Sequence, residues 1–314
     1  MSDGSRLAGA HPSLVDRLVA LALRPARARG AVVLAFHQID AAKFEGWVRL
    51  LSRHFELVSL DELLRRHKAG ESLSGLLAIT FDDGWADACE PVARLCAHHR
   101  WPVLIYLVSG ALTSRTSLWF AELPALLDAA SGRRVEAGGF VLDMSTRSRA
   151  RRSTSDLVKR LKRLTGSAAL HVVGQLRIAA GLSPLDSGAA FVDTSFTERY
   201  RESEWVRFGS HTVDHQAMAA QHPSAIDSQC RESKRELEDI LGQPVRHLAY
   251  PYGAPSEVGT VAPSIARRHY ASAVTMVRGI CDSRADAAAL PRVPLYDRDG
   301  NVRMIAKIAL APWL

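Results

Sequence analysis

Residues 75–85, "GLLAITFDDGW", place two adjacent carboxylates, Asp82 and Asp83, directly after a short apolar run. A run this short and apolar that ends in a β-branched residue is typical of a strand buried on both faces. Asp-Gly then breaks the strand, and residues 86–99, "ADACEPVARLCAHH", follow with helical spacing. A solvated turn before a helix is the alternative explanation. The order strand, acidic turn, helix favours a functional site, because α/β proteins place such sites at the carboxyl ends of their strands.

Apolar runs and amphipathic segments alternate along most of the chain. One helix can be capped by Ser59 or Asp61 and ended by Gly70. The expected strands span residues 31–36, 56–60, 75–80, 102–108, 206–210, 246–251, 271–276 and 290–295, and the expected helices span 41–55, 61–70, 86–99, 224–242 and 264–270. This alternation predicts a mostly parallel α/β sheet, either open or closed into a barrel.

The middle of the chain follows a different pattern. Residues 119–182 predict a long helical region, and its irregular stretch at 131–153 fits an insertion better than a second domain. We therefore expect a helical extension at residues 1–30 and one domain at 31–314, with an insertion at about 112–194.

Composition and hydropathy are those of an ordinary globular protein. The 314 residues are 47% hydrophobic and 23% charged. No apolar run approaches the roughly 18 residues that span a bilayer. The N-terminal stretch "LVALAL" is shorter than a signal-peptide core and follows no basic cluster. We expect a short amphipathic helix there, docked on the domain or resting on a membrane surface.

The four cysteines lie in unrelated contexts and form no C-x-x-C pair. They are Cys89, Cys96, Cys230 and Cys281. This pattern argues against a metal-thiolate site, and it would be a sparse disulfide framework for a secreted protein. We expect a cytoplasmic protein, with peripheral attachment to the inner membrane face as the alternative.

The basic charge is concentrated in one segment. The formal net charge is +7, and residues 147–163, "RSRARRSTSDLVKRLKR", hold eight basic residues against one acid, Asp156. This local excess equals the net charge of the whole chain, so the residues outside this segment have no net charge. We therefore expect no nucleic-acid partner. A solvated helix explains the patch, and contact with an anionic polymer or a membrane surface is the alternative.

Two histidines follow another predicted strand. In residues 208–216, "FGSHTVDHQ", His211 and His215 are four positions apart, so both imidazoles share one face if the segment is helical. Two histidines at this spacing commonly hold a divalent metal, although a chain with 12 histidines also produces such pairs by chance. Because Gly209 and Ser210 end a strand, this pair also lies at the carboxyl edge of the sheet.

The ligand types leave two metal chemistries open. A zinc protease has Glu directly after the first histidine, where this chain has Thr212. An iron oxygenase site of two histidines and one carboxylate fits the residue types and remains a rival. The acid pair can supply the third ligand. One carboxylate would then bind the metal, and its neighbour would do acid/base work.

Three motifs together resemble one family. "TFDDG" at residues 80–84, followed by "SHTVDH" at 210–215, resembles the first two motifs of the polysaccharide deacetylases, carbohydrate esterase family four of the NodB-homology type. "LAYPYG" at 248–253 resembles the third motif. The resemblance runs from about residue 31 to residue 296. It implies a distorted (β/α) barrel, seven-stranded and carrying a helical insertion, and metal-dependent removal of an acetyl group from an N-acetylated sugar.

The resemblance also assigns roles to individual residues. Asp82 matches the catalytic base and Asp83 the metal-binding acid, while His211 and His215 match the two metal-binding histidines. The backbone amide near Tyr252 would help to hold the oxyanion.

Two departures from the commoner family pattern change the remaining assignments. No arginine opens the third motif, and no late Leu-x-x-His supplies a general acid. "LAFHQI" at 34–39 resembles the N-terminal YHxV-like segment of a permuted branch, so His37 is assigned as the general acid. A histidine that caps a strand or lines a pocket is the alternative. Arg292, in "LPRVPLY", would replace the missing arginine beside Asp82, although a structural ion pair explains it equally well.

We therefore expect a metal-dependent carbohydrate de-N-acetylase that acts on a glycan, an exopolysaccharide or a glycolipid. The cofactor expected is a divalent metal, with Zn²⁺ favoured and Co²⁺, Ni²⁺ or Fe²⁺ also compatible with the ligands. The partner expected is an N-acetylated sugar or glycan. The alternatives are an amide hydrolase for another acyl group and a non-catalytic glycan-binding protein of the same fold. Trp85 would either line a sugar groove or pack between strand ends.

Overall fold

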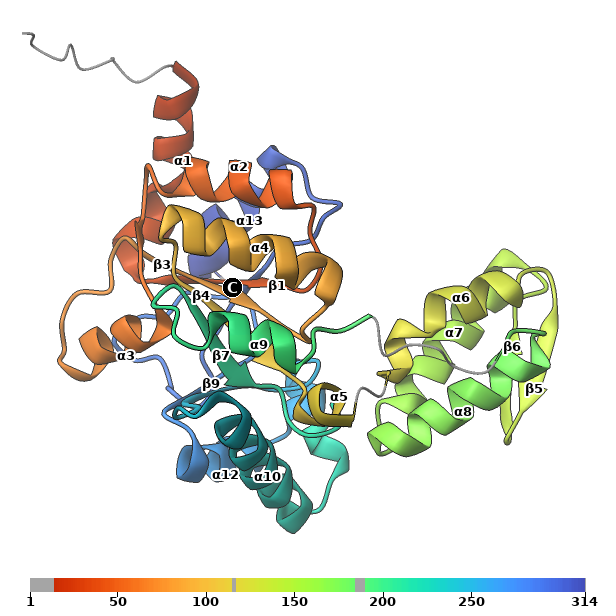
Figure 1. Cartoon of the computed structure of the whole chain (residues 1–314). Coiled ribbons are helices and arrows are strands. Elements are labelled where there is room, and N and C mark those ends of the chain that lie inside the picture. The colour runs from red at the N-terminus through yellow and green to blue at the C-terminus, as the bar shows by residue number, and fades with distance from the viewer. Residues whose placement is uncertain (1–13, 115–116, 184–189, 314) are drawn as a thin grey trace, which may run out of the picture.

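A curled parallel sheet forms the centre of the molecule (Figure 1). The computed structural model describes residues 14–114, 117–183 and 190–313. Seven strands run in the order β10-β1-β3-β4-β7-β8-β9, and an eighth, β2, pairs with β3. Every pairing in this sheet is parallel. The strands are β1 (Val32–Phe36), β2 (Glu56–Leu57), β3 (Leu76–Phe81), β4 (Val103–Leu107), β7 (Val206–Ser210), β8 (His247–Ala249), β9 (Ser272–Val274) and β10 (Val293–Pro294). This confirms the distorted, seven-stranded (β/α) barrel.

One segment joins the two edges of the sheet. Leu290 bridges Val274 of β9, and the Arg292 N–H donates to the Val277 carbonyl at 2.9 Å. A few residues later β10 pairs with β1. The segment from residue 290 to 295 therefore contacts both edge strands and carries Arg292 into the interior of the barrel.

Helices cover the outside of the sheet, as the sequence pattern predicts. Ser59, rather than Asp61, caps α3, because its side-chain oxygen accepts from the Glu62 N–H at 3.1 Å. The barrel helices are α2 (Ala41–Leu51), α3 (Leu60–Lys68), α4 (Ala86–His99), α5 (Ser109–Ser114), α9 (Thr194–Tyr200), α10 (Pro223–Leu241), α11 (Pro255–Val258), α12 (Ala262–His269) and α13 (Asn301–Leu310), with short 3₁₀ turns η2 (Met218–Ala220) and η3 (Ala311–Trp313).

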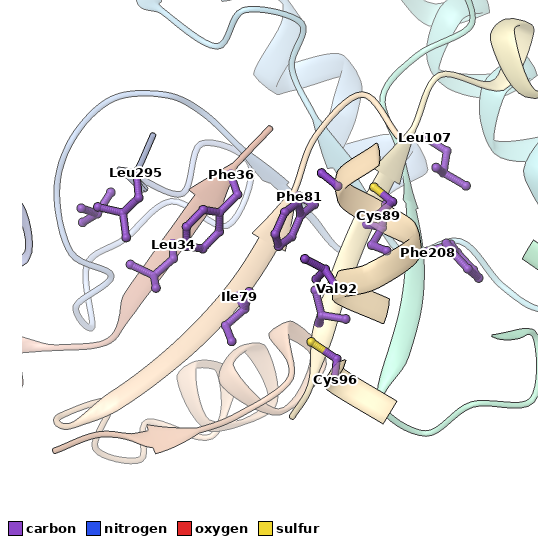
Figure 2. Packing of buried hydrophobic residues seen from close by; sticks show 14 of the residues in the cluster. Leu34, Phe36, Ile79, Phe81, Cys89, Val92, Cys96, Leu107, Phe208 and Leu295 are labelled. Atoms are coloured by element: carbon purple, nitrogen blue, oxygen red, sulfur yellow. The ribbon is translucent and has the colours of Figure 1, made fainter. Parts of the chain in front are cut away.

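The packing of the core fixes the register of β1 against β3. Phe36, Phe44 and Phe81 are fully buried and form an aromatic cluster, with ring centroids 5.0–5.7 Å apart. Figure 2 shows Phe36 and Phe81 side by side on the two strands, beside the apolar face of α4. Because Phe36 is paired with Phe81, the next residues on the two strands, His37 and Asp82, leave the sheet at the same edge.

The inserted region forms a separate lobe beside the barrel (Figure 1) with its own buried core. Within the irregular stretch expected at 131–153, residues 134–143 form an antiparallel hairpin. Gly138 and Gly139, with φ of 57° and 74°, make its turn. The elements are η1 (Trp119–Ala121), α6 (Leu123–Ala129), β5 (Arg134–Ala137), β6 (Phe140–Asp143), α7 (Arg147–Leu161) and α8 (Gly166–Ala179). The domain limits proposed at residues 30, 112 and 194 stay predictions.

Helix α1 (Leu14–Arg29) packs against α13 and buries Val19, Leu23 and Ala26. Among the described helices, none is long and apolar enough to cross a membrane. All four cysteines are buried free thiols.

We predict that Phe44→Ala lowers the free energy of unfolding by roughly 3–5 kcal/mol, because it leaves a cavity among three fully buried rings. Urea denaturation checks this. Val302→Ala, at a side chain that is 84% exposed, is the matched control and should change stability by no more than about 0.5 kcal/mol. Equal losses in the two variants would contradict the assignment of this cluster to the core.

Candidate active site

The acid pair lies where β3 leaves the sheet. The Asp82 N–H donates to the Phe36 carbonyl at 2.9 Å, which ties the pair to the end of β1. Asp82 is 2% exposed and Asp83 6% exposed. Asp83 and Gly84 then take left-handed backbone conformations, with φ of 70° and 81°. This turn sends the two adjacent carboxylates in different directions, so each meets its own partners.

The two histidines follow β7, and they are not on a helix. The His211 N–H donates to the Leu107 carbonyl at 2.8 Å, after which the chain turns sharply. Thr212 has φ of 69° and His215 has φ of 58°. The condition of a helix is therefore not met, and the imidazoles converge through a tight turn that contains two left-handed residues.

Asp83, His211 and His215 form a group that could hold a metal ion. The Asp83 Oδ1 atom lies 3.3 Å from His211 Nε2 and 3.2 Å from His215 Nε2. The two Nε2 atoms are 3.2 Å apart. The three atoms therefore make an almost equilateral triangle in a site where all three side chains are buried.

The chemistry of the three atoms fits a cation. His211 Nδ1 lies 2.7 Å from the Ala249 carbonyl, which fixes the proton on Nδ1 and leaves a lone pair on Nε2. Asp83 Oδ1 is buried without a hydrogen bond of good geometry among the described residues. Ligand atoms at about 2.0–2.2 Å from one ion in a tetrahedral arrangement lie roughly 3.3–3.6 Å apart, close to the spacing here. Burial opposes the charge on Asp83, but the two histidines outweigh it and hold the pKa of Asp83 well below its usual range.

Backbone strain is concentrated around this triangle. Five non-glycine residues of the described chain have positive φ, a conformation that L-residues adopt at a cost. Arg100 caps a helix, whereas the other four are Asp83, Thr212, His215 and Tyr252. Strain kept at four positions of one site indicates that the surrounding structure enforces a particular arrangement of side chains.

Asp82 makes a two-pronged ion pair with Arg292. The Nη1–H and Nη2–H groups of Arg292 donate to the two carboxylate oxygens at 2.7 and 2.6 Å. Arg292 is fully buried, and it also donates to the Thr275 carbonyl and the Thr80 hydroxyl. Burial alone would raise the pKa of Asp82, but the guanidinium charge outweighs it and leaves this pKa below its usual value. Asp82 is thereby held ionised and fixed in orientation.

His37 and Tyr252 are the last two of the residues assigned to the site. His37 Nε2 lies 3.9 Å from Asp82 Oδ2, and the His37 side chain is 34% exposed, so it faces solvent where the two acids do not. The Tyr252 ring packs edge-on against the His215 ring, with centroids 4.7 Å apart. Among the described residues, no backbone carbonyl accepts a hydrogen bond from the Tyr252 N–H. The structure brings all seven assigned residues to one edge of the barrel, and their roles stay predictions.

Aromatic side chains line the same edge. Trp85 donates its Nε1–H to Asp83 Oδ2 at 3.1 Å and packs against Phe191 and Phe120. Phe120, whose ring lies 4.9 Å from that of His215, comes from the insertion and was not predicted from the sequence. Neighbouring Trp119 lies in the core of the insertion. No motif marks Phe120, because its position depends on how the insertion docks.

We predict that Arg292→Met lowers the free energy of unfolding at pH 7 by roughly 3–5 kcal/mol, because it leaves the buried Asp82 charge unpaired. The depressed pKa of Asp82 stabilises the native protein above the usual carboxyl range, and this contribution is lost as the pH falls. The gap between wild type and variant should therefore narrow between pH 7 and about pH 4.

Urea denaturation in the presence of a chelator, repeated across this pH range, measures that gap. The double variant Asp82→Asn/Arg292→Met is the control, and it should recover much of the loss. A gap that stays constant with pH, or a double variant less stable than Arg292→Met, would contradict this account of the pair.

Comparison with known proteins agrees with this geometry. Residues 143–266 match the model of the polysaccharide deacetylase family. No curated protein matches the chain. Among solved structures, the Streptococcus pyogenes deacetylase PplD superposes with a TM-score of 0.59 at 14% identity, over 89% of this chain and 98% of that one.

Two further structures share the fold at a similar sequence identity and TM-score. IcaB from Ammonifex degensii has a TM-score of 0.56 at 16% identity, covering 91% of this chain and 98% of its own. A de-N-acetylase from Aggregatibacter actinomycetemcomitans has a TM-score of 0.54 at 13% identity, covering 88% and 99%. At these identities the likeness is one of fold. The permuted branch suggested by residues 34–39 stays a prediction. The matched segment, residues 143–266, includes the second and third motifs, and it is similar to the polysaccharide deacetylase family, while the whole chain shares the fold of these deacetylase structures.

Proposed function

We propose that the protein is a metal-dependent hydrolase that removes the N-acetyl group from an N-acetylated sugar in a glycan, an exopolysaccharide or a glycolipid. The observation that carries this proposal is the division of the acid pair. Asp83 faces two imidazole nitrogens at 3.2–3.3 Å, while its neighbour Asp82 faces Arg292. A site that needed only a metal would have no use for a second carboxylate held ionised beside it.

The triangle of Asp83, His211 and His215 would hold the ion, with Zn²⁺ favoured and Co²⁺, Ni²⁺ or Fe²⁺ also matched by these ligands. A divalent ion in this place would polarise the acetyl carbonyl and lower the pKa of a water molecule toward about 7. Three protein ligands are typical of catalytic zinc sites, because they leave a coordination position open for water or for the acetyl carbonyl.

Asp82 would act as the general base. Arg292 fixes both carboxylate oxygens and keeps the group charged at neutral pH, so Asp82 is ready to accept a proton from the attacking water. As the carbon–oxygen bond forms, negative charge develops on the carbonyl oxygen. The Tyr252 N–H, which makes no backbone hydrogen bond within the described chain, would donate to that oxygen.

His37 would act as the general acid. Its imidazole is 34% exposed and lies 3.9 Å from Asp82, so it borders the site and is open to solvent, from which the sugar would enter. The proton that His37 donates goes to the amine as the carbon–nitrogen bond breaks, which gives acetate and a free amino sugar. An imidazole suits this role because it can donate a proton and take one up again in each turnover.

Two alternatives make different demands on the site. An amide hydrolase for another acyl group, such as formyl, would use the same residues and differ only in the pocket for the acyl group. A glycan-binding protein without turnover would not need the strained turns, which carry a cost in stability, or a second carboxylate held ionised beside the metal triangle. The presence of both features favours an enzyme over a binding protein.

We predict that the purified protein binds one equivalent of Zn²⁺ and that His215→Ala weakens this binding at least 100-fold, since it removes one of three ligands. Metal content after dialysis and calorimetric titration of the chelator-treated protein measure the effect. His98→Ala, at an exposed histidine outside the site, is the control. Unchanged affinity in His215→Ala would place the metal elsewhere.

We predict that the metal-loaded protein releases acetate from an N-acetylated hexasaccharide, and that Asp82→Asn and His37→Ala each lower kcat by about 10²–10⁴-fold. Both variants should retain the metal. Acetate release, measured beside metal content, checks this. Full activity in His37→Ala would remove this residue as the acid, and no release by the wild type from neutral or acidic N-acetylated hexasaccharides would contradict the proposed function.

A further inference from the structure

Helix α7 carries a basic face that the catalytic proposal does not use. Arg147, Arg151, Ser155 and Lys159 follow one another at intervals of four residues, which places them along one side of the helix. Arg152 lies beside this stripe, and all of these basic side chains are exposed. The helical rise puts Arg151 and Lys159 about 12 Å apart.

The charges on this face are not neutralised by neighbours. Within the described chain, no carboxylate lies within 4 Å of Arg147, Arg151, Arg152 or Lys159. Helix α10 shows the opposite pattern, because Arg231 pairs with Asp227 and Arg235 with Asp239. An ordinary solvated helix resembles α10, where the local charges balance. Helix α7 holds one acid, Asp156, among its basic residues, so it presents a net positive field.

The basic stripe ends in a groove between the insertion and the barrel. This groove has a volume of about 600 Å³. Lys159, Lys162 and Arg163 line its insertion side, while Ala217 and Ser256 line its barrel side. Only one acid, Glu257, faces these three cations, and it pairs with Lys162 at 3.2 Å. The groove therefore keeps a net positive charge.

The groove lies next to the candidate metal site. Lys162 Nζ is 4.3 Å from the centroid of the Tyr252 ring, and that ring also packs against the ring of His215, 4.7 Å away between centroids. Two hydrogen bonds fix the junction, from the Ala217 N–H to the Lys162 carbonyl and from the Gly166 N–H to Asp214 Oδ2. A chain lying in the groove would thus reach the metal site across one aromatic ring.

The geometry points to an acidic glycan as the substrate. The stripe on α7 and the groove at its end bind carboxylate- or phosphate-bearing units of an N-acetylated glycan, and they present a neighbouring N-acetyl group to the site. This inference rests on the proposed function and names its substrate class. A neutral glycan would gain nothing from four uncompensated cations, whereas an anionic one gains both affinity and a faster encounter.

Two other anionic partners fit the surface less well. A membrane surface would be bound through apolar side chains that insert between headgroups, and the exposed stripe from Arg147 to Lys159 holds only basic and hydroxyl side chains. A single-stranded nucleic acid would be bound through aromatic stacking platforms, and the sequence of α7 contains no aromatic residue. The groove beside the metal site favours a glycan chain over either.

Binding of labelled oligosaccharides to the metal-loaded Asp82→Asn variant tests the inference without turnover. The probes are a hyaluronan hexasaccharide, an oligogalacturonate hexasaccharide and neutral chitohexaose, measured by fluorescence anisotropy from 50 to 500 mM NaCl. We expect at least one acidic probe to bind at least tenfold more tightly than chitohexaose at low salt. The preference should shrink as salt screens the charges.

A matched pair of charge changes locates the binding face. Arg151→Gln/Lys159→Gln should weaken binding of the acidic probe about tenfold and leave chitohexaose unaffected. Arg231→Gln/Arg235→Gln, which removes the same charge from α10, should change binding less than twofold. Equal effects of the two pairs, or no preference for either acidic probe, would overturn the inference.

Tighter binding to phosphatidylglycerol vesicles or to a DNA oligonucleotide than to both acidic hexasaccharides would also overturn it. Failure of this inference can be distinguished from failure of the proposed function. Acetate release without a preference for acidic probes removes the inference and keeps the deacetylase. Preferential binding through α7 without acetate release from any probe keeps the binding face and removes the enzyme.

Discussion

The buried ion pair between Asp82 and Arg292 is the interaction on which the rest of the site depends. Asp82 ends β3, and Arg292 lies on the segment that touches both edges of the curled sheet. The pair therefore joins the middle of the sheet to its closure. A fully buried guanidinium is tolerated only with its hydrogen bonds made, and here they go to Asp82, Thr80 and Thr275. With Asp82 committed to this partner, its neighbour Asp83 is free to face the two histidines.

The sequence pattern predicted the parallel fold, and the family resemblance added the seven residues assigned to the site, which the structure places near one another and whose roles stay predictions. The signals were local, since apolar runs end in Asp-Asp-Gly or Gly-Ser-His and the carboxyl ends of parallel strands meet at one edge. Arg292 does not follow this rule, because it precedes β10, and it was proposed only as a replacement for the arginine missing from the third motif. The turn after His211 could not be predicted, because two histidines four residues apart suggest a helix. Nothing in the amino-acid sequence indicates that Thr212 and His215 adopt positive φ.

The insertion was the hardest part to predict, for two physical reasons. Residues 131–153 were recognised as irregular, but the Gly138-Gly139 hairpin within them was not, because each of its strands has only four residues. Its contribution to the site depends on tertiary docking. Phe120 against His215 and Lys162 against Tyr252 are contacts between elements far apart in sequence. The barrel thus supplies the seven assigned residues, and the insertion supplies one wall beside them.

The most direct test of this account is an X-ray structure of the zinc-loaded protein with anomalous diffraction data at the zinc edge. The account predicts one strong peak at about 2.0–2.2 Å from Asp83 Oδ1, His211 Nε2 and His215 Nε2. It also predicts that Asp82 stays outside the coordination sphere, still bound by both arms of Arg292. A peak elsewhere, or an ion that draws Asp82 away from Arg292 to become a ligand, would contradict the division of labour between the two acids.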